Sequence, residues 1–167
     1  AEIHEVVDTL QSGWLTTGPK TKEFETQFAE FVGANHAIAV NSCTAGLHVA
    51  LATAGIGPGD EVIVPTMTFA STANVVIHQC ARPVFVDVLP DTLNIDPTAV
   101  ALAITPRTKA IIPVHLYGHP CRMDRLRAIA REHNLLLIED AAHAIGAYWH
   151  DQAVGCIGDA TAFSFYA

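Results

Sequence analysis

A carboxylate at the end of an apolar run is the strongest chemical signal in this sequence. Four apolar residues, Leu135 to Ile138, precede Glu139 and Asp140, and a run of small residues follows. This pattern predicts a buried parallel strand, and open α/β sheets bind ligands at the carboxyl ends of such strands. Asp140 could cap the next helix or pair with a basic side chain. Alternatively, it could hold a proton on a ring nitrogen, as the aspartate that faces the pyridine nitrogen of pyridoxal phosphate (PLP) does.

Two further residues could contact a flat ring bound near Asp140. His143 follows Asp140 by three residues, so both side chains can face one ligand, although a lone histidine there is more often structural. Phe69 follows another predicted strand among small polar residues, where its ring could stack on a ligand or simply join the core. For Phe69 taken alone, the signal is weak, whereas the pairing with Asp140 favours a site role for His143.

An anion could bind between another predicted strand and the helix that follows it. Residues 41–46, NSCTAG, combine small side chains with the hydroxyls of Ser42 and Thr44. Free N–H groups in the first turn of a helix attract phosphate, and the helix dipole adds to the attraction. Ser42 or Thr44 could instead be no more than a helix N-cap. Ser164, near the end of the chain, could offer another hydroxyl to an anion or merely fill a strand.

The sequence predicts no metal site and no nucleotide-binding loop. His115 and His119 have the spacing of two ligands on one helical face, but Tyr117, Gly118 and Pro120 indicate a turn there. The cysteines are widely spaced, which argues against a zinc knuckle and against a disulfide framework. No Walker loop occurs, and the glycines of residues 55–59 precede a strand, so they predict a turn rather than a dinucleotide fingerprint.

Composition limits the class of protein and the kind of partner. A chain of 167 residues with 50% hydrophobic residues is long enough for one domain with a sizeable core. Its formal net charge is -8 and its basic residues are scattered, which argues against a nucleic-acid partner. No apolar run suits a membrane span, and the first residues lack the features of a secretory signal. We therefore expect a soluble cytoplasmic protein that acts on a small molecule.

Alternating helices and strands predict an α/β fold. The predicted helices lie at residues 3–11, 44–54, 71–79, 97–104 and 123–133, with one more that is capped at Thr21 and ends at Gly33. The predicted strands lie at residues 37–40, 61–64, 84–88, 110–114, 135–139 and 160–167. Repeated units of strand, helix and strand imply a mainly parallel sheet flanked by helices on both faces. No linker or internal repeat interrupts them, so we predict no domain boundary within the chain.

Six stretches, in this order and spacing, resemble the DegT/StrS family of nucleotide-sugar aminotransferases. They are GWLTTGP (13–19), NSCTAGLH (41–48), GPGDEVI (57–63), PVHLYG (113–118), EDAAHA (139–144) and FSF (163–165). The resemblance implies a fold-type-I PLP-dependent transferase large domain over residues 1–167. Residues 14–19 and 104–115 are most similar to the members that form UDP-4-amino-4-deoxy-L-arabinose from the 4-keto sugar.

The resemblance implies roles for three residues around the cofactor ring. Phe69 would stack on the pyridine ring of PLP, and Asp140 would pair with the protonated ring nitrogen. His143 would lie near the phenolic oxygen of the ring. A carboxylate on the ring nitrogen keeps the pyridinium charged, which strengthens the cofactor as an electron sink.

The resemblance also implies where the phosphate and the sugar bind. Thr44 and Ala45 would hold the phosphate of PLP through backbone and hydroxyl groups, and Ser164 would add another hydroxyl. The residues expected to help bind the nucleotide sugar are Trp14, Thr16 and Gly18.

The implied reaction is a transamination in two halves. Glutamate would give its amino group to PLP and leave as 2-oxoglutarate, and the amine would then pass to a nucleotide-linked keto sugar. The expected acceptor is a UDP-4-keto sugar that serves cell-surface polysaccharide or lipid A modification. Family members are homodimers with shared active sites, so we expect a homodimer here.

The family's covalent PLP lysine falls outside this chain, two residues after Ala167. Lys20, Lys22 and Lys109 do not match its position. We therefore interpret residues 1–167 as a fragment that ends just before this lysine and lacks the small C-terminal domain. Two alternatives stay open: a PLP-dependent sugar dehydratase of the same family, with histidine in place of the lysine, and a non-catalytic regulatory or binding homologue.

Overall fold

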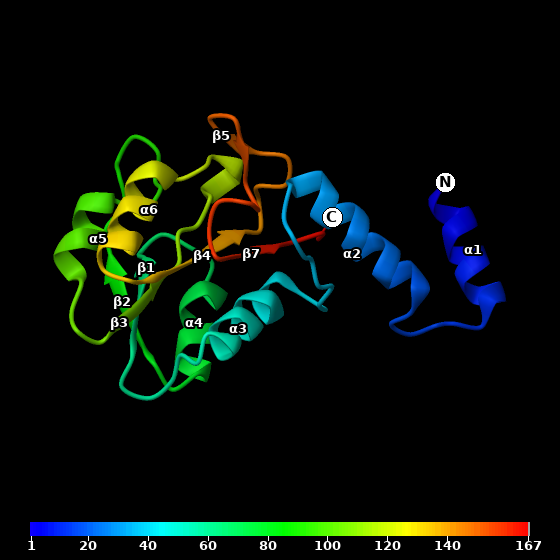
Figure 1. Ribbon diagram of the computed structural model, residues 1–167, viewed down its shortest axis with the longest axis horizontal. Helices are drawn as coiled ribbons and strands as arrows, with labels where there is room; N and C mark the ends of the chain where they lie inside the picture. The colour runs from blue at the N-terminus through cyan, green and yellow to red at the C-terminus, as the bar shows by residue number, and fades with distance from the viewer. Residues whose placement is uncertain (167) are drawn as a thin grey trace. The chain divides into compact units, whose positions relative to one another are not determined.

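The computed structural model describes residues 1–166 and separates into two compact units, Ala1–Ala39 and Val40–Ala167. The first unit is helical and the second carries the sheet (Figure 1). We predicted no boundary within residues 1–167, whereas the contacts between residues separate the chain into two units near residue 39. The first unit buries few side chains. The assignment of the whole chain to one PLP-binding domain stays a prediction.

The first unit consists of α1 (Glu2–Ser12) and α2 (Pro19–Val32). α1 confirms the predicted helix and extends it by one residue at each end. The predicted cap at Thr21 is wrong, because Gly18 is the N-cap and the proline after it suits the first helical position. Gly33 ends α2 as predicted, in the left-handed conformation (φ 75°) that glycine adopts most easily.

The strand predicted at residues 37–40 is also wrong. These residues belong to no ladder, and the side chains of Ile38 and Val40 are exposed. The N–H of Ala39 instead donates to Oε1 of Glu25 on α2 over 3.0 Å. An extended segment forms a strand only when a neighbouring strand pairs with its backbone, and the described residues provide none beside it.

The second unit is built on a parallel sheet. Its strands are β1 (Glu61–Pro65), β2 (Arg82–Val86), β3 (Thr108–Ile111), β4 (Leu136–Ala141) and β7 (Ala160–Phe163). Their order is β2-β1-β3-β4-β7, and every neighbouring pair is parallel. The predicted α/β fold is therefore confirmed, although strand ends shift by a few residues. The last predicted strand stops at Phe163, and its final predicted residue, Ala167, lies outside the described residues.

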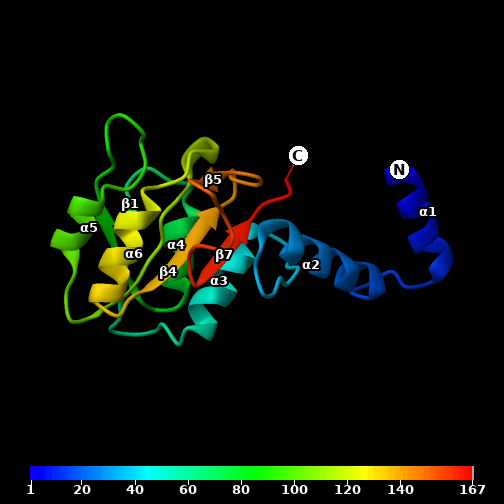
Figure 2. The ribbon, with the colours of Figure 1, turned by 45° about the horizontal axis from the view of Figure 1, so that its top comes forward.

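Helices cover both faces of this sheet (Figures 1 and 2). They are α3 (Cys43–Thr53), α4 (Ser71–His78), α5 (Pro97–Ala103) and α6 (Met123–Glu132). Leu51 of α3 belongs to one core cluster, and Leu126 of α6 belongs to another. Val62 and Ile63 of β1, adjacent in sequence, enter these two clusters separately. Strands buried on both faces explain why the sequence shows unbroken apolar runs rather than alternation.

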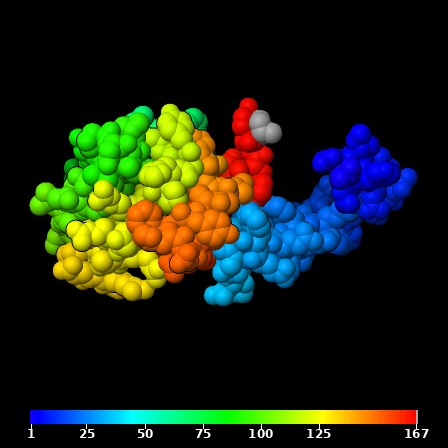
Figure 3. Space-filling model, turned by 90° about the horizontal axis from the view of Figure 1, so that it is seen from above, coloured from blue at the N-terminus to red at the C-terminus, as the bar shows by residue number. Residues whose placement is uncertain are grey.

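Two short elements lie outside the parallel sheet and its helices. A 3₁₀ turn covers Leu116–Gly118, where the sequence indicates a turn, and a hairpin that was not predicted pairs β5 (Tyr148–Trp149) with β6 (Gln152–Ala153). The hairpin, orange in Figure 3, lies on the surface of the second unit. None of the described helices has the length and apolar content needed to cross a membrane.

A carboxylate network stabilises the amino end of β1, opposite the end that would bind a ligand. Oε2 of Glu61 accepts a hydrogen bond from the Thr105 hydroxyl over 2.6 Å, and Oε1 lies 2.7 Å from Nη2 of Arg107 and 3.5 Å from Nη1 of Arg82. The Thr105 hydrogen bond and the two guanidinium groups hold the pKa of Glu61 below its ordinary value, and burial opposes them. This network has a structural role, because it joins β1 to the first residue of β2 and to the residues just before β3.

The lowered pKa of Glu61 predicts a pH dependence of stability. A carboxylate whose pKa is lower in the folded state stabilises the fold above its unfolded pKa, and the effect is lost as the pH falls through the folded pKa. We expect Glu61→Gln to lower the thermal unfolding midpoint at neutral pH, and its deficit to shrink as the pH falls below about 4. Unfolding followed by circular dichroism from pH 7 to 3 measures this, with Glu132→Gln on the exposed end of α6 as the control. A deficit that stays constant with pH would contradict the assignment.

Candidate active site

Asp140 lies where we predicted it, at the carboxyl end of β4, and it is 4% exposed. Its Oδ2 accepts a hydrogen bond from the buried Thr72 hydroxyl over 2.8 Å, and its Oδ1 accepts one from the N–H of Ala142 over 3.3 Å. Because Thr72 donates to Asp140, the 2.7 Å contact between the Thr72 and Thr68 hydroxyls must have Thr68 as donor. Asp140 forms no ion pair with any described residue, so the pairing with a basic side chain that we considered does not occur there.

Cys43 connects Asp140 to the start of α3. Its Sγ lies 3.8 Å from Oδ1 of Asp140 and 3.4 Å from the carbonyl oxygen of Ala162 on β7. Burial, and then the charge of Asp140 and the hydrogen bond to it, raise the pKa of the Cys43 thiol to about 12. The thiol therefore stays protonated and adds no second negative charge beside Asp140.

The anion site that we predicted corresponds to the first turn of α3, whose first residue, Cys43, contacts this carboxylate. Ser42 is the N-cap, and its hydroxyl accepts a hydrogen bond from the N–H of Ala45 over 3.1 Å. A Cβ on Gly46 would lie 3.3 Å from Cβ of Ala162, so glycine lets α3 approach β7 closely. The N-cap alternative therefore holds for Ser42, whereas Thr44 lies one residue inside the helix, where a first-turn N–H can face an anion.

Ser164 follows the last residue of β7, at the same end of the sheet as Asp140. Its Oγ accepts a hydrogen bond from the N–H of Tyr166 over 3.3 Å, and its side chain is half-buried. Ser164 is therefore not an interior residue of the strand, and its hydroxyl lies on the loop that continues beyond the sheet.

Phe69 is not a core residue. It lies in the loop between β1 and α4, and 79% of its surface is exposed. Its carbonyl oxygen accepts a hydrogen bond from the N–H of Thr72 over 3.1 Å, so one residue contacts both Phe69 and Asp140. An exposed aromatic ring at the ligand-binding edge of a parallel sheet can stack on a flat ligand.

His143 is exposed in the loop after β4, and an aromatic ring stacks on it. The partner is Tyr117 of the 3₁₀ turn, with ring centroids 5.9 Å apart and ring planes inclined by 4°. Tyr117 was not among the predicted site residues. The only feature of the sequence that could have indicated it is its place in the turn after β3. The stacking itself joins distant residues, so no local pattern reveals it.

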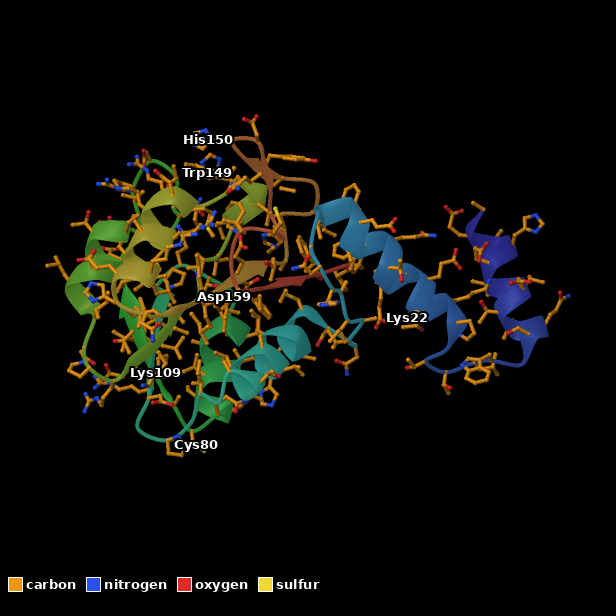
Figure 4. All side chains as sticks on the ribbon, viewed as in Figure 1. Lys22, Cys80, Lys109, Trp149, His150 and Asp159 are labelled. Atoms are coloured by element: carbon orange, nitrogen blue, oxygen red, sulfur yellow. The ribbon has the colours of Figure 1, made fainter. Side chains whose placement is uncertain are left out.

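A cavity of the second unit lies elsewhere. It has a volume of about 720 Å³ and lies at the amino ends of β3 and β4, with Lys109, Arg131 and Asp159 in its wall. Figure 4 labels Lys109 and Asp159 on that side of the sheet. Lys109 is the second residue of β3, so its position agrees with the prediction that it does not replace the covalent lysine. The described residues contain no group of three or more metal-ligating side chains.

A second buried carboxylate, Glu139, was missed as a structural centre of the site. Its Oε2 accepts a hydrogen bond from Nε2 of His115 over 2.8 Å, and its Oε1 accepts from the N–H of Gly158 over 2.7 Å and the Thr161 hydroxyl over 3.0 Å. Nδ1 of His115 in turn accepts from the N–H of Cys121 over 3.1 Å, which places the imidazole proton on Nε2. An acid directly after an apolar run was the available signal, because a buried carboxylate requires partners.

The loop predicted to bind the sugar belongs to the first unit. Nε1 of Trp14 donates a hydrogen bond to the carbonyl oxygen of Thr17 over 2.9 Å, so the loop closes on itself. A Cβ on Gly18 would collide with the indole of Trp14, so this close approach requires glycine. Thr16 lies between them and is exposed. The roles of Trp14, Thr16 and Gly18 in binding the sugar stay predictions.

Comparisons with known proteins show what the whole chain is similar to. A model of the DegT/DnrJ/EryC1/StrS aminotransferase family matches residues 1–167. The spore coat polysaccharide biosynthesis protein SpsC of Bacillus subtilis (strain 168) is 58% identical over 166 residues, which are 99% of this chain and 43% of SpsC.

Two solved structures are also similar. DesV of S. venezuelae, in complex with a ketimine intermediate, superposes with a TM-score of 0.93 and 46% identity over 96% of this chain and 43% of DesV. Spr1654 of Streptococcus pneumoniae, in its PLP form, superposes with a TM-score of 0.95 and 43% identity over 100% of this chain and 46% of Spr1654. The chain therefore spans less than half the length of these relatives.

The environment of Cys43 predicts slow reaction with alkylating reagents. With a pKa of about 12, the thiol is almost entirely protonated at pH 8, and the thiolate is the form that reacts. We expect iodoacetamide to label Cys43 at least tenfold more slowly than exposed Cys80 (Figure 4), by peptide mass spectrometry. Asp140→Asn removes one cause of the raised pKa and is expected to speed the labelling of Cys43 but not of Cys80. Equal rates at the two cysteines in the unmodified protein would contradict the geometry.

Proposed function

The chain belongs to the DegT/DnrJ/EryC1/StrS aminotransferase family, and from this premise we propose that it is the cofactor-binding part of a sugar aminotransferase. The enzyme would use PLP to move an amino group from glutamate to a nucleotide-linked keto sugar. The observation that carries this proposal is the buried carboxylate of Asp140, which receives hydrogen-bond donors but no cation from the described residues. A buried carboxylate of this kind suits a protonated pyridine nitrogen as its partner.

The residues at this edge of the sheet fit the parts of PLP. PLP, when bound, supplies the electron sink that makes a Cα–H bond labile. Asp140 would hold the proton on the ring nitrogen, while Thr72 and the N–H of Ala142 fix the orientation of its carboxylate. The exposed ring of Phe69 would cover one face of the cofactor, and the imidazole of His143 would face its phenolic oxygen.

The phosphate of PLP would lie at the start of α3. Thr44 would offer its N–H and hydroxyl, and the N–H of Ala45 would leave its bond to Ser42 or share it with the phosphate. The hydroxyl of Ser164 would approach the phosphate from the end of β7. These roles are proposals. The Cys43 thiol of the same helix lies 3.8 Å from Oδ1 of Asp140, so the helix that would hold the phosphate contacts the residue that would hold the ring nitrogen.

The acceptor would be a keto sugar carried by a nucleotide, and we favour a UDP-4-keto sugar. The loop that contains Trp14, Thr16 and Gly18 would contact this substrate. The name of the relative SpsC, a spore coat polysaccharide biosynthesis protein, supports a product used in cell-surface polysaccharide. Lipid A modification is the finer alternative, and it rests on the resemblance of residues 14–19 and 104–115 alone.

The whole protein would contain parts beyond this chain. We propose a cytoplasmic homodimer with shared active sites, and a lysine two residues after Ala167 that binds PLP and moves the proton during the reaction. A histidine at that position would favour the dehydratase alternative. A residue there that is neither lysine nor histidine would favour a binding homologue.

A visible absorption spectrum tests the proposed half-reaction. We expect the whole protein to develop the band of bound PLP and, after glutamate is added, to convert it to the spectrum of the pyridoxamine form. Added 2-oxoglutarate should restore the first spectrum, because the half-reaction is reversible. Bound PLP that does not respond to glutamate would contradict the aminotransferase and favour the dehydratase or the binding homologue.

Thr72 provides a sharper test of the site. Thr72→Val keeps the shape of the side chain and removes its hydrogen bond to Asp140, and hydrogen bonds to charged groups contribute about 1.5 to 3 kcal/mol. We expect PLP to dissociate about tenfold to a hundredfold more readily, measured by equilibrium titration. Thr26→Val is the matched control, since the Thr26 hydroxyl bonds to a backbone carbonyl of α2. Unchanged PLP affinity in Thr72→Val would contradict the proposal that the carboxylate of Asp140, as Thr72 orients it, binds PLP.

A further inference from the structure

We infer that Tyr117 is a positioning residue for the proposed cofactor site, where its ring holds the imidazole of His143 in one orientation. The inference rests on the proposed function, because His143 matters there only if PLP binds beside Asp140. It concerns a residue that neither the predicted PLP contacts nor the predicted sugar contacts include.

The stacking itself is the first observation. The centroids of the two rings are 5.9 Å apart and their planes are nearly parallel, at 4°. This separation lies within the range in which aromatic rings attract each other. Tyr117 is 77% exposed, so burial in the core does not explain the position of its side chain.

The backbone of Tyr117 is the second observation. Tyr117 adopts φ 52° and ψ 27°, a left-handed conformation that is unfavourable for a residue with a Cβ. Strained residues of this kind persist where the surrounding structure enforces them, and they cluster at functional sites. A conformation that places an exposed aromatic ring flat against a candidate site histidine fits this pattern.

Contacts on the amino-terminal side of Tyr117 anchor the turn at His115. The buried His115 ring is fixed between Glu139 and the N–H of Cys121, at 2.8 Å and 3.1 Å. The backbone N–H of His115 donates to the carbonyl oxygen of Asp140 over 3.0 Å. The turn that carries Tyr117 is thereby attached to the residue that would hold the ring nitrogen of PLP.

Contacts on the carboxyl-terminal side attach the same turn to His143. Gly118 has φ 83°, and a Cβ there would lie 3.0 Å from the carbonyl oxygen of His143. The absence of a side chain at residue 118 lets the turn approach the His143 backbone closely. Tyr117 therefore belongs to a turn that contacts the Asp140 to His143 loop at both ends, with its ring on the imidazole.

The stacking leaves part of the His143 imidazole available to the cofactor. The two rings are nearly parallel and offset, so Tyr117 contacts the imidazole through its face, and a nitrogen at the ring edge could bond to an oxygen of the cofactor. The phenolic hydroxyl takes no part in this stacking. Phenylalanine should therefore replace tyrosine without loss, whereas an aliphatic side chain should not.

A double-mutant cycle tests whether Tyr117 acts through His143. We expect Tyr117→Leu to weaken PLP binding by the whole protein about twofold to tenfold, and Tyr117→Phe to leave it unchanged within twofold. In the background of His143→Gln, Tyr117→Leu should have no further effect. Tyr148→Leu, at an exposed tyrosine of the β5–β6 hairpin, is the matched control.

Two measurements separate positioning from a role in folding. Tyr117→Gly relieves the left-handed strain, so we expect an equal or higher unfolding midpoint together with the same loss of PLP affinity. In the cofactor-free protein, the imidazole NMR signal that disappears in His143→Gln should shift in Tyr117→Leu, because the ring current of the tyrosine is lost.

Several outcomes would overturn the inference. Equal effects of Tyr117→Leu with and without His143 would show that Tyr117 acts on its own, and equal effects of Phe and Leu would assign the role to the hydroxyl. A His143 signal that does not shift in Tyr117→Leu would show that the two rings are not stacked in solution. Failure of the unmodified protein to bind PLP would overturn the proposed function and this inference together, whereas the other outcomes leave PLP binding intact.

Discussion

Two carboxylates buried at consecutive positions constrain the structure around the end of β4. Glu139 is fully buried and Asp140 nearly so, and their side chains lie on opposite faces of the sheet because successive residues of a strand alternate. A buried carboxylate is costly unless other groups satisfy it. Each therefore requires donors from elements that lie far away in the sequence, and these donors define the edge of the sheet where we place the cofactor.

The two carboxylates are satisfied in different ways. Glu139 receives an imidazole, a hydroxyl and a backbone N–H, and Gly158 is required because a Cβ there would lie 2.6 Å from the carbonyl oxygen of Leu137. Asp140 receives the Thr72 hydroxyl and a backbone N–H, with a thiol at longer distance. Glu139 thus has the more complete set of partners within the chain, whereas Asp140 retains the capacity to bind a cationic ligand.

Local patterns predicted the parts of the fold whose cause is local. Apolar runs located the strands of the sheet, and the acid at the end of one run located Asp140 at its carboxyl edge. The strand expected at residues 37–40 failed because pairing depends on a neighbour that no local pattern reveals. The stacking of Tyr117 on His143 and the bond between His115 and Glu139 escaped prediction for the same reason: each joins residues more than twenty positions apart.

The protonated thiol of Cys43 affects which ligands the carboxylate of Asp140 can bind. Were Cys43 ionised, a second negative charge would lie 3.8 Å from Oδ1 of Asp140, and the two anions would together attract a metal ion or a proton. Burial and Asp140 itself raise the pKa of the thiol to about 12, so Cys43 remains a donor at neutral pH. The carboxylate of Asp140 is therefore not joined by a second anion from Cys43, and it lies beside the amino end of a helix that attracts anions. A ligand that carries a proton on a ring nitrogen at one end and a phosphate at the other satisfies both features at once, and this is the electrostatic reason why this arrangement suits PLP.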